Sequence, residues 1–187
     1  MATTKCLLYC TKAKPYLIEY ENDNDYISYL EYRLEESPKG LCFEEKILNG
    51  KIVAECDVET EKLKKLSLAE RRNGFLRYEN EEEILQQSCL SGEQLRHYLR
   101  KTDGYALHIK NLKEKILSFD KDCIFKKPHG NEVIKRATQN MQWCFDRRGN
   151  RYALISIRPE WLCKILNGEK TIEIRKKVLK GMCDDEW

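Results

Sequence analysis

The sequence predicts a mixed α/β fold of the α+β type, built as one compact domain. Its 187 residues are enough for one well-buried core. Several short segments alternate apolar and polar residues with the period of a strand, and two others carry the start and stop signals of short helices. The clearest of these signals form a strand-helix-strand unit at the C-terminus.

The composition is that of a folded chain outside the membrane. Hydrophobic residues make up 41%, charged residues 35% and aromatic residues 10%, which argues against intrinsic disorder. No apolar run approaches the roughly 18–20 residues of a membrane span, and the first residues do not resemble a secretion signal. We therefore expect a cytoplasmic protein without a membrane partner.

The nine cysteines are expected to be reduced thiols, most of them in the core. Their number is odd, and most lie in apolar stretches. A zinc site is the alternative, but Cys6 and Cys10 lie four apart on a predicted strand, about 13 Å from each other. There is no C-x-x-C motif and the three histidines are scattered. We expect no metal site and no cofactor.

The first strand is predicted at residues 5–12, from the composition of KCLLYCTK. Residues 16–40 are acidic and rich in tyrosine, and they are interpreted as a surface excursion or hairpin. A half-buried strand at 51–59, entered through an Asn-Gly turn, follows from its alternating pattern. Residues 61–72 are charged and helix-prone.

A capped helix is predicted next. Ser91 with Gln94 three residues later forms a capping-box pattern, and the apolar stripe behind it consists of Leu95, Tyr98 and Leu99.

The middle of the chain is expected to hold one more long strand and one short strand. GYALHIKNL at 104–112 alternates as a strand does, and 113–140 is interpreted as a basic connecting segment with its loop tip at 128–130. A short strand is expected around Trp143, followed by a turn at 146–150.

The C-terminal unit has the strongest local signals. A strand at 151–157 leads to Pro159 in the first turn of a helix, which ends at Gly168 before a strand at 171–175. Two strands and a short helix cannot bury their own apolar faces, so this unit must dock on the rest of the chain.

The same geometry gathers polar groups beside Arg158, at the end of the first strand of the unit. These groups form a receptor for an anionic or amide-bearing ligand such as a nucleotide. The candidate ligand-binding residues are Arg158, Lys170, Thr171, Glu173 and Arg175, with Trp161 and Tyr9 as stacking surfaces and Lys12 beside them. The alternative is a cross-strand ladder of ion pairs, with Trp161 in the core.

Charge is unevenly distributed along the chain. Residues 19–61 hold thirteen acidic and four basic residues, whereas residues 151–180 hold eight basic and three acidic residues. One end of the molecule is therefore expected to attract phosphate, although such runs are also common on solvated faces.

The segment SIRPEWLCKILNGEKTIEIRKK at 156–177 resembles the opening of the ASCH family, small barrels of the PUA-like superfamily. Earlier pieces resemble what ordinarily follows that opening: YCTKAKPYL, NGKIVAECDV, GYALHIKNL and QNMQWC. The resemblance implies a circularly permuted domain over 1–187, in which the C-terminal unit completes the barrel. The alternative is an ASCH-like domain at 1–148 followed by a truncated second unit at 151–187.

The resemblance also implies function. PUA-like barrels mostly bind RNA or modified nucleotides, and some ASCH proteins hydrolyse the acetyl amide of N4-acetylcytidine with the lysine of a G-x-K-T motif. Lys170 matches that lysine, but Glu173 stands where the family has a threonine. If the chain is an enzyme, Lys170 and Glu173 are the catalytic candidates. A third hypothesis is a phage-type anti-defence protein that acts through a protein or nucleic-acid partner, with the acidic segment 19–48 as a protein-binding or nucleic-acid-mimicking surface.

Overall fold

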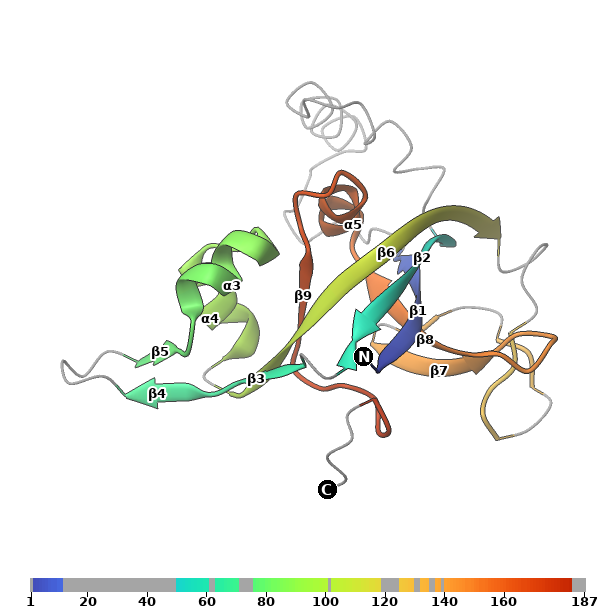
Figure 1. Cartoon of the computed structure of the whole chain (residues 1–187), viewed down its shortest axis with the longest axis horizontal. Coiled ribbons are helices and arrows are strands. Elements are labelled where there is room, and N and C mark those ends of the chain that lie inside the picture. The colour runs from blue at the N-terminus through green and yellow to red at the C-terminus, as the bar shows by residue number, and fades with distance from the viewer. Residues whose placement is uncertain are drawn as a thin grey trace, which may run out of the picture.

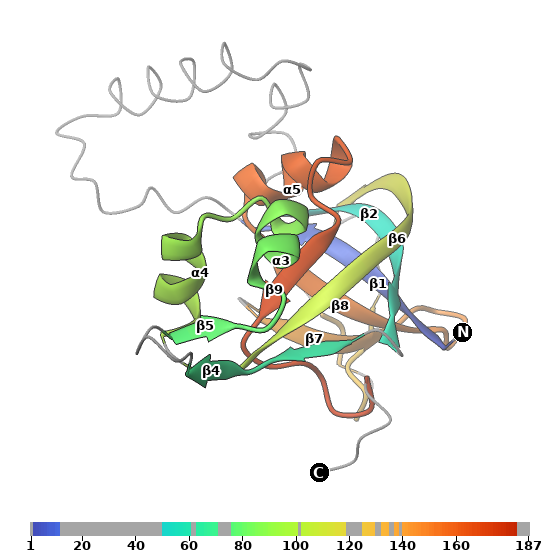
Figure 2. The ribbon, with the colours of Figure 1, turned by 60° about the vertical axis from the view of Figure 1, so that its left-hand side comes forward.

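The protein has a mixed α+β fold in which a curled, strand-rich sheet forms a half-barrel, with three helices in the described part of the chain (Figures 1 and 2). The computed structural model describes residues 2–11, 50–60, 63–70, 76–100, 102–118, 125–129, 132–134, 137–138 and 140–182. The expected excursion at 16–40, the acidic segment 19–48 and Lys12 lie outside these residues.

The helices and strands follow in a fixed order along the chain. The strands are β1 (Thr3–Cys10), β2 (Lys51–Glu59), β3 (Lys64–Leu66), β4 (Leu68–Glu70), β5 (Leu76–Tyr78), β6 (Gly104–Ser118), β7 (Met141–Phe145), β8 (Arg151–Ile157) and β9 (Ile172–Arg175). The helices are α3 (Glu81–Ser88), α4 (Gly92–Leu99) and α5 (Pro159–Leu166). Seven strands form one sheet in the order β3-β6-β2-β1-β8-β7, with β9 paired to β6, while β4 and β5 form a separate hairpin.

The strand β1 lies in the middle of this sheet. It pairs antiparallel with β2 and parallel with β8. Cys6 through Cys10 are all buried, because side chains pack on both faces of the sheet here. Val53, which alternates with the charged residues of β2, is 1% exposed. The pairing of β1 with β2 shifts register beside it, and its side chain packs in the same cluster as Ala54.

The strand β6 is longer than expected, and the prediction that 113–118 belongs to a connecting segment is wrong. These residues continue the antiparallel ladder with β2 as far as Lys51 and Ser118. Their charged side chains are compatible with a strand because residues 113–115 are all exposed in this part of β6, where Lys115 is 3.9 Å from Glu55.

The helix propensity of residues 61–72 is not realised in their described part, residues 63–70. Residues 64–66 form β3, which pairs with the start of β6, and residues 68–70 form β4. Leu66 is buried beneath α3 and α4, so sheet pairing and burial override the helix propensity of the surrounding lysines and glutamates.

The two helices of the middle segment cover one face of β6 and β9. The capping box of Ser91 and Gln94 is confirmed at the start of α4. The sequence did not predict α3, which precedes it. Both helices pack on an apolar cluster that contains Leu95, Leu99 and Ile174.

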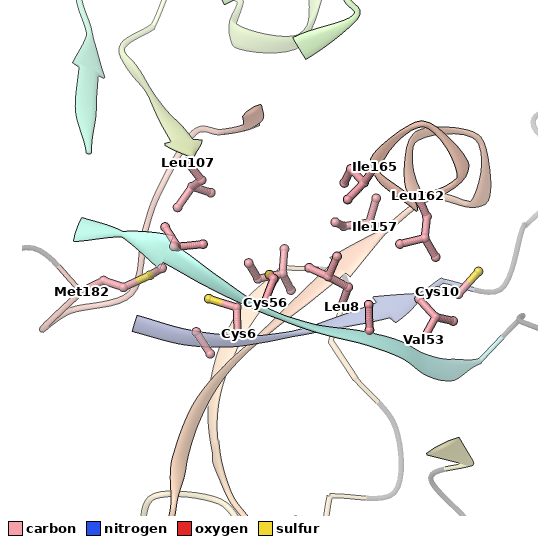
Figure 3. Close-up of a cluster of buried hydrophobic side chains, with 14 residues drawn as sticks. Cys6, Leu8, Cys10, Val53, Cys56, Leu107, Ile157, Leu162, Ile165 and Met182 are labelled. Atoms are coloured by element: carbon pink, nitrogen blue, oxygen red, sulfur yellow. The ribbon is translucent and has the colours of Figure 1, made fainter. Parts of the chain in front are cut away.

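The C-terminal strand, helix and strand are confirmed at their predicted positions, and Gly168 has the left-handed φ of 75° expected after a helix. The unit is part of the main sheet, because β8 pairs with β1 and β9 pairs with β6. Leu162 and Ile165 of α5 cover one end of the interior cluster of the half-barrel (Figure 3).

The expectation of core thiols agrees with the six described cysteines, none of which forms a disulfide within the described residues. Five of them are buried, and Cys89 is partly exposed. No three histidine, cysteine or acidic side chains within the described ranges are placed to share a metal ion. No helix in the same ranges is long and apolar enough to cross a membrane.

Candidate functional site

An ionic cluster centred on Glu173 lies on the inner face of β9. Ile172 and Ile174 pack beneath α3 and α4, so the side chains that alternate with them point to the other face of the strand. There Glu173 pairs with two cations: its Oε2 is 3.3 Å from Nζ of Lys170, and its Oε1 is 3.0 Å from a terminal guanidinium nitrogen of Arg175. Glu173 and Arg175 are 9% exposed and Lys170 is 3% exposed.

Arg175 also links the two strands of the C-terminal unit. The guanidinium donates a hydrogen bond to the backbone carbonyl of Ser156 on β8, although β9 itself is paired with β6. Its Nε is buried and makes no hydrogen bond within the described residues. Arg175 thus has at least one buried donor that no described group satisfies.

Lys170 lies at the turn before β9 and contacts the C-terminal end of α3. Its ammonium donates to the carbonyl of Ser88 at 2.9 Å, and the backbone N–H of Thr171 donates to the carbonyl of Gln87 at 2.9 Å. The last carbonyls of a helix have no partner within the helix and carry partial negative charge, so an ammonium is well placed there. On another side, Lys170 Nζ is 5.5 Å from the ring centroid of Trp161.

Burial lowers the pKa of Lys170 below its ordinary value of 10.5, and the carboxylate of Glu173 opposes this shift. The pKa of Tyr98 on α4 is raised, first by burial, while the nearby charge of Arg175 opposes that rise. The cluster therefore combines a lysine biased toward its neutral form with a carboxylate that favours the ammonium.

Exposed polar and basic groups lie near the residues of the cluster along the chain. They are Arg158 at the N-cap of α5, Thr171 before β9, and Lys176 and Lys177 after it. Trp161 is partly buried, and Nζ of Lys164 is 5.1 Å from its ring centroid.

The structure brings together four of the predicted site residues: Lys170, Glu173, Arg175 and Trp161. Arg158 and Thr171 lie at the exposed edge described above. Tyr9 does not join them, because it is 6% exposed and packs with Leu7 and Ile52 on the opposite face of β1 from Leu8 and Cys10. Lys12 lies outside the described residues.

Two contributors to this site come from outside the C-terminal unit and were missed. The carbonyl of Ser88 belongs to α3, whose signal was three acidic residues in its first turn, 81–83, ahead of the apolar Ile84 and Leu85. Tyr98 was assigned to the apolar stripe of α4 but is 39% exposed.

A buried cluster of this kind contributes little net stability by itself, because removing three charges from water offsets most of their mutual attraction. Ionisable groups in such surroundings are enriched at functional sites. Comparisons with models of known protein families, with curated protein sequences and with solved structures found no match to this chain. The function is therefore argued from the site.

Proposed function

We propose that the chain is a circularly permuted ASCH domain with a PUA-like barrel, and that it binds RNA or a nucleotide. The permutation is supported by strand pairing. Cys6 through Cys10 run parallel to residues 153–157, and residues 105–108 run antiparallel to β9. A truncated second unit at 151–187 would not be expected to contribute strands to the sheet that contains β1.

The observation that carries the binding proposal is the buried Lys170–Glu173–Arg175 cluster set within a basic, partly aromatic surface. The cations at its edge, Arg158 and Lys176, suit phosphate oxygens. The cluster itself offers a carboxylate acceptor beside ammonium and guanidinium donors, which suits the mixed donors and acceptors of a base edge. Together these groups match a ligand that carries both a phosphate and a base.

The test is equilibrium binding of a fluorescein-labelled single-stranded RNA, followed by anisotropy over a series of salt concentrations. We expect affinity to fall with salt, and Arg158→Ala and Lys176→Ala each to weaken binding and reduce the salt slope by about one. The matched control is Lys127→Ala, an exposed lysine paired with Glu132 outside the C-terminal unit. Absence of binding at low salt, or an equal loss in the control, would contradict the proposal.

A second candidate function is hydrolysis of a modified nucleoside such as N4-acetylcytidine. It is favoured by the lowered pKa of Lys170 beside a carboxylate. In this reaction a neutral Lys170 would take a proton from water, and the resulting hydroxide would add to the amide carbonyl. The lysine ammonium would then return that proton to N4 as the C–N bond breaks, which releases cytidine and acetic acid, and the acid ionises to acetate. The bonds to Glu173 and to the carbonyl of Ser88 favour the ammonium form instead, so we rank this function second.

The two functions differ in their products. Wild-type protein and a Lys170→Ala variant with the same circular dichroism spectrum are incubated with N4-acetylcytidine and with short RNAs. Binding of the nucleoside or RNA to the protein and release of acetate are both measured. Acetate from wild type alone would establish the hydrolase, with Lys170 as its catalytic residue. Retention without acetate would support the binding module.

A further inference from the structure

The side chain of Tyr98 is an exposed aromatic ring beside the ionic cluster. Among the large hydrophobic residues that the structure describes, Tyr98 and Val133 are exposed, at 39% and 40%. Tyr98 lies on α4, outside the C-terminal unit that supplies most of the site (Figure 2). The buried side chains of α4 share an apolar cluster with Ile172 and Ile174 of β9.

The helix α4 holds this ring in a fixed position. Its first turn is closed by the reciprocal hydrogen bonds of Ser91 and Gln94, at 3.1 Å and 2.9 Å. Leu95 and Leu99, on its other face, are fully buried against β6 and β9. An aromatic ring on a packed and capped helix loses little conformational entropy when a ligand stacks on it.

The surroundings of Tyr98 mirror those of Trp161. The ammonium of Lys176 is 5.5 Å from the Tyr98 ring centroid, just as the ammonium of Lys170 is 5.5 Å from that of Trp161. Burial and the charge of Glu173 raise the pKa of the Tyr98 hydroxyl, whereas the charge of Arg175 and the backbone of Lys176 lower it, so these groups lie close to that hydroxyl. The ionic cluster therefore has an aromatic ring next to Lys170 at one end and another next to Arg175 and Lys176 at the other.

The charges around Tyr98 suit a nucleic acid. Arg100 at the end of the same helix is exposed, as are Lys176 and Lys177 after β9. Cations that contact phosphates and rings that stack on bases are the two elements of single-strand recognition. In a duplex the bases are stacked on each other, so they are not available to stack on the Tyr98 ring.

We propose that Tyr98 is a base-stacking residue of this surface, and that the surface therefore prefers single-stranded RNA to duplex RNA. The inference rests on the proposed RNA-binding function. Stacking on one aromatic side chain typically changes affinity by about 5- to 150-fold.

The test measures binding of a single-stranded RNA and of a duplex of equal length to Tyr98→Ala, Tyr98→Phe and the control Val133→Ala. We expect Tyr98→Ala to bind the single strand at least about fivefold more weakly, with an unchanged salt slope. Binding of the duplex should stay as in wild type. Tyr98→Phe, which keeps the ring, and Val133→Ala should match wild type.

Three outcomes overturn the inference in different ways. If Tyr98→Ala binds the single strand as wild type does while Arg158→Ala still weakens it, the stacking role is refuted and the proposed function stands. Equal losses for single strand and duplex would refute the preference for exposed bases. If wild type binds neither RNA, the proposed function and this inference fail together.

Discussion

Replacing Glu173 with alanine leaves two buried cations without their shared counter-ion. The carboxylate lies 3.3 Å from Lys170 and 3.0 Å from Arg175, and all three residues are at least nine-tenths buried. Removing one partner of a buried ion pair typically costs about 3–5 kcal/mol, because the remaining charge stays out of water. The carbonyls of Ser88 and Ser156 still accept hydrogen bonds from the two cations, so we expect the lower end, about 3 kcal/mol.

That loss is large relative to the stability of a domain, which is about 5–15 kcal/mol. For a chain of this size each kcal/mol lowers the melting temperature by about 2–4 °C, so Glu173→Ala should melt about 6–12 °C below wild type. Urea unfolding should give the corresponding change in free energy. A Lys170→Met change in the Glu173→Ala background should recover part of it, because one unpaired buried charge is then gone.

An exposed ion pair serves as the control that separates the effect of burial from the effect of a short distance between the two charges. Lys127 and Glu132 approach within 2.8 Å, closer than either pair of Glu173, but their side chains are 49% and 68% exposed. An exposed pair contributes about 0–1 kcal/mol, so Glu132→Ala should have little effect. If Glu173→Ala lowers the free energy of unfolding no more than Glu132→Ala does, burial does not make the Glu173 ion pairs more important for stability than an exposed pair.

Three further predictions concern pH, capping and thiols. Burial lowers the pKa of Lys170 below 10.5, so the unfolded chain binds this proton more tightly. The free energy of unfolding should therefore gain a contribution that rises with pH between the folded pKa and 10.5, and urea titrations from pH about 8 to about 10 should show that Lys170→Met lacks it. Ser91→Ala should lower stability by about 1 kcal/mol in thermal unfolding, whereas Ser91→Asn, which keeps a capping oxygen, should not. Cys89 is partly exposed and should be alkylated before Cys6, Cys56 and Cys144, as peptide mapping by mass spectrometry would show; equal rates would contradict the described burial.

The C-terminal unit was predictable because its signals are local. Pro159 marks the start of a helix, Gly168 its end, and the alternation of 171–175 a strand. The same is true of the capping box at Ser91. These features depend on the conformation of a few adjacent residues, which the sequence states directly.

The errors arose where distant segments decide the structure. Residues 64–66 are helix-prone on their own but pair with the start of β6, about forty residues later in the chain. The extension of β6 through 113–118 depends likewise on β2. Local propensity contains no information about either partner.

The site was predicted in its polar residues but not in their burial. The alternation along β9 placed Glu173 and Arg175 on one face, and three charged groups would ordinarily be expected in water. They are buried because α3, α4 and the half-barrel enclose β9 from both sides. Tyr98 was misjudged for the converse reason, since its helical spacing indicates a core residue while the observed packing leaves its ring exposed.

The central claim is that the surface around the Glu173 cluster binds RNA, and backbone amide chemical shifts test it most directly. A single-stranded RNA is titrated into ¹⁵N-labelled protein and the shift changes are mapped onto the chain. We predict that the largest chemical-shift changes fall at Arg158, Trp161 and residues 170–177, with smaller ones at Tyr98. Changes confined to other elements, such as the exposed face of β6, or no changes at low salt, would contradict it.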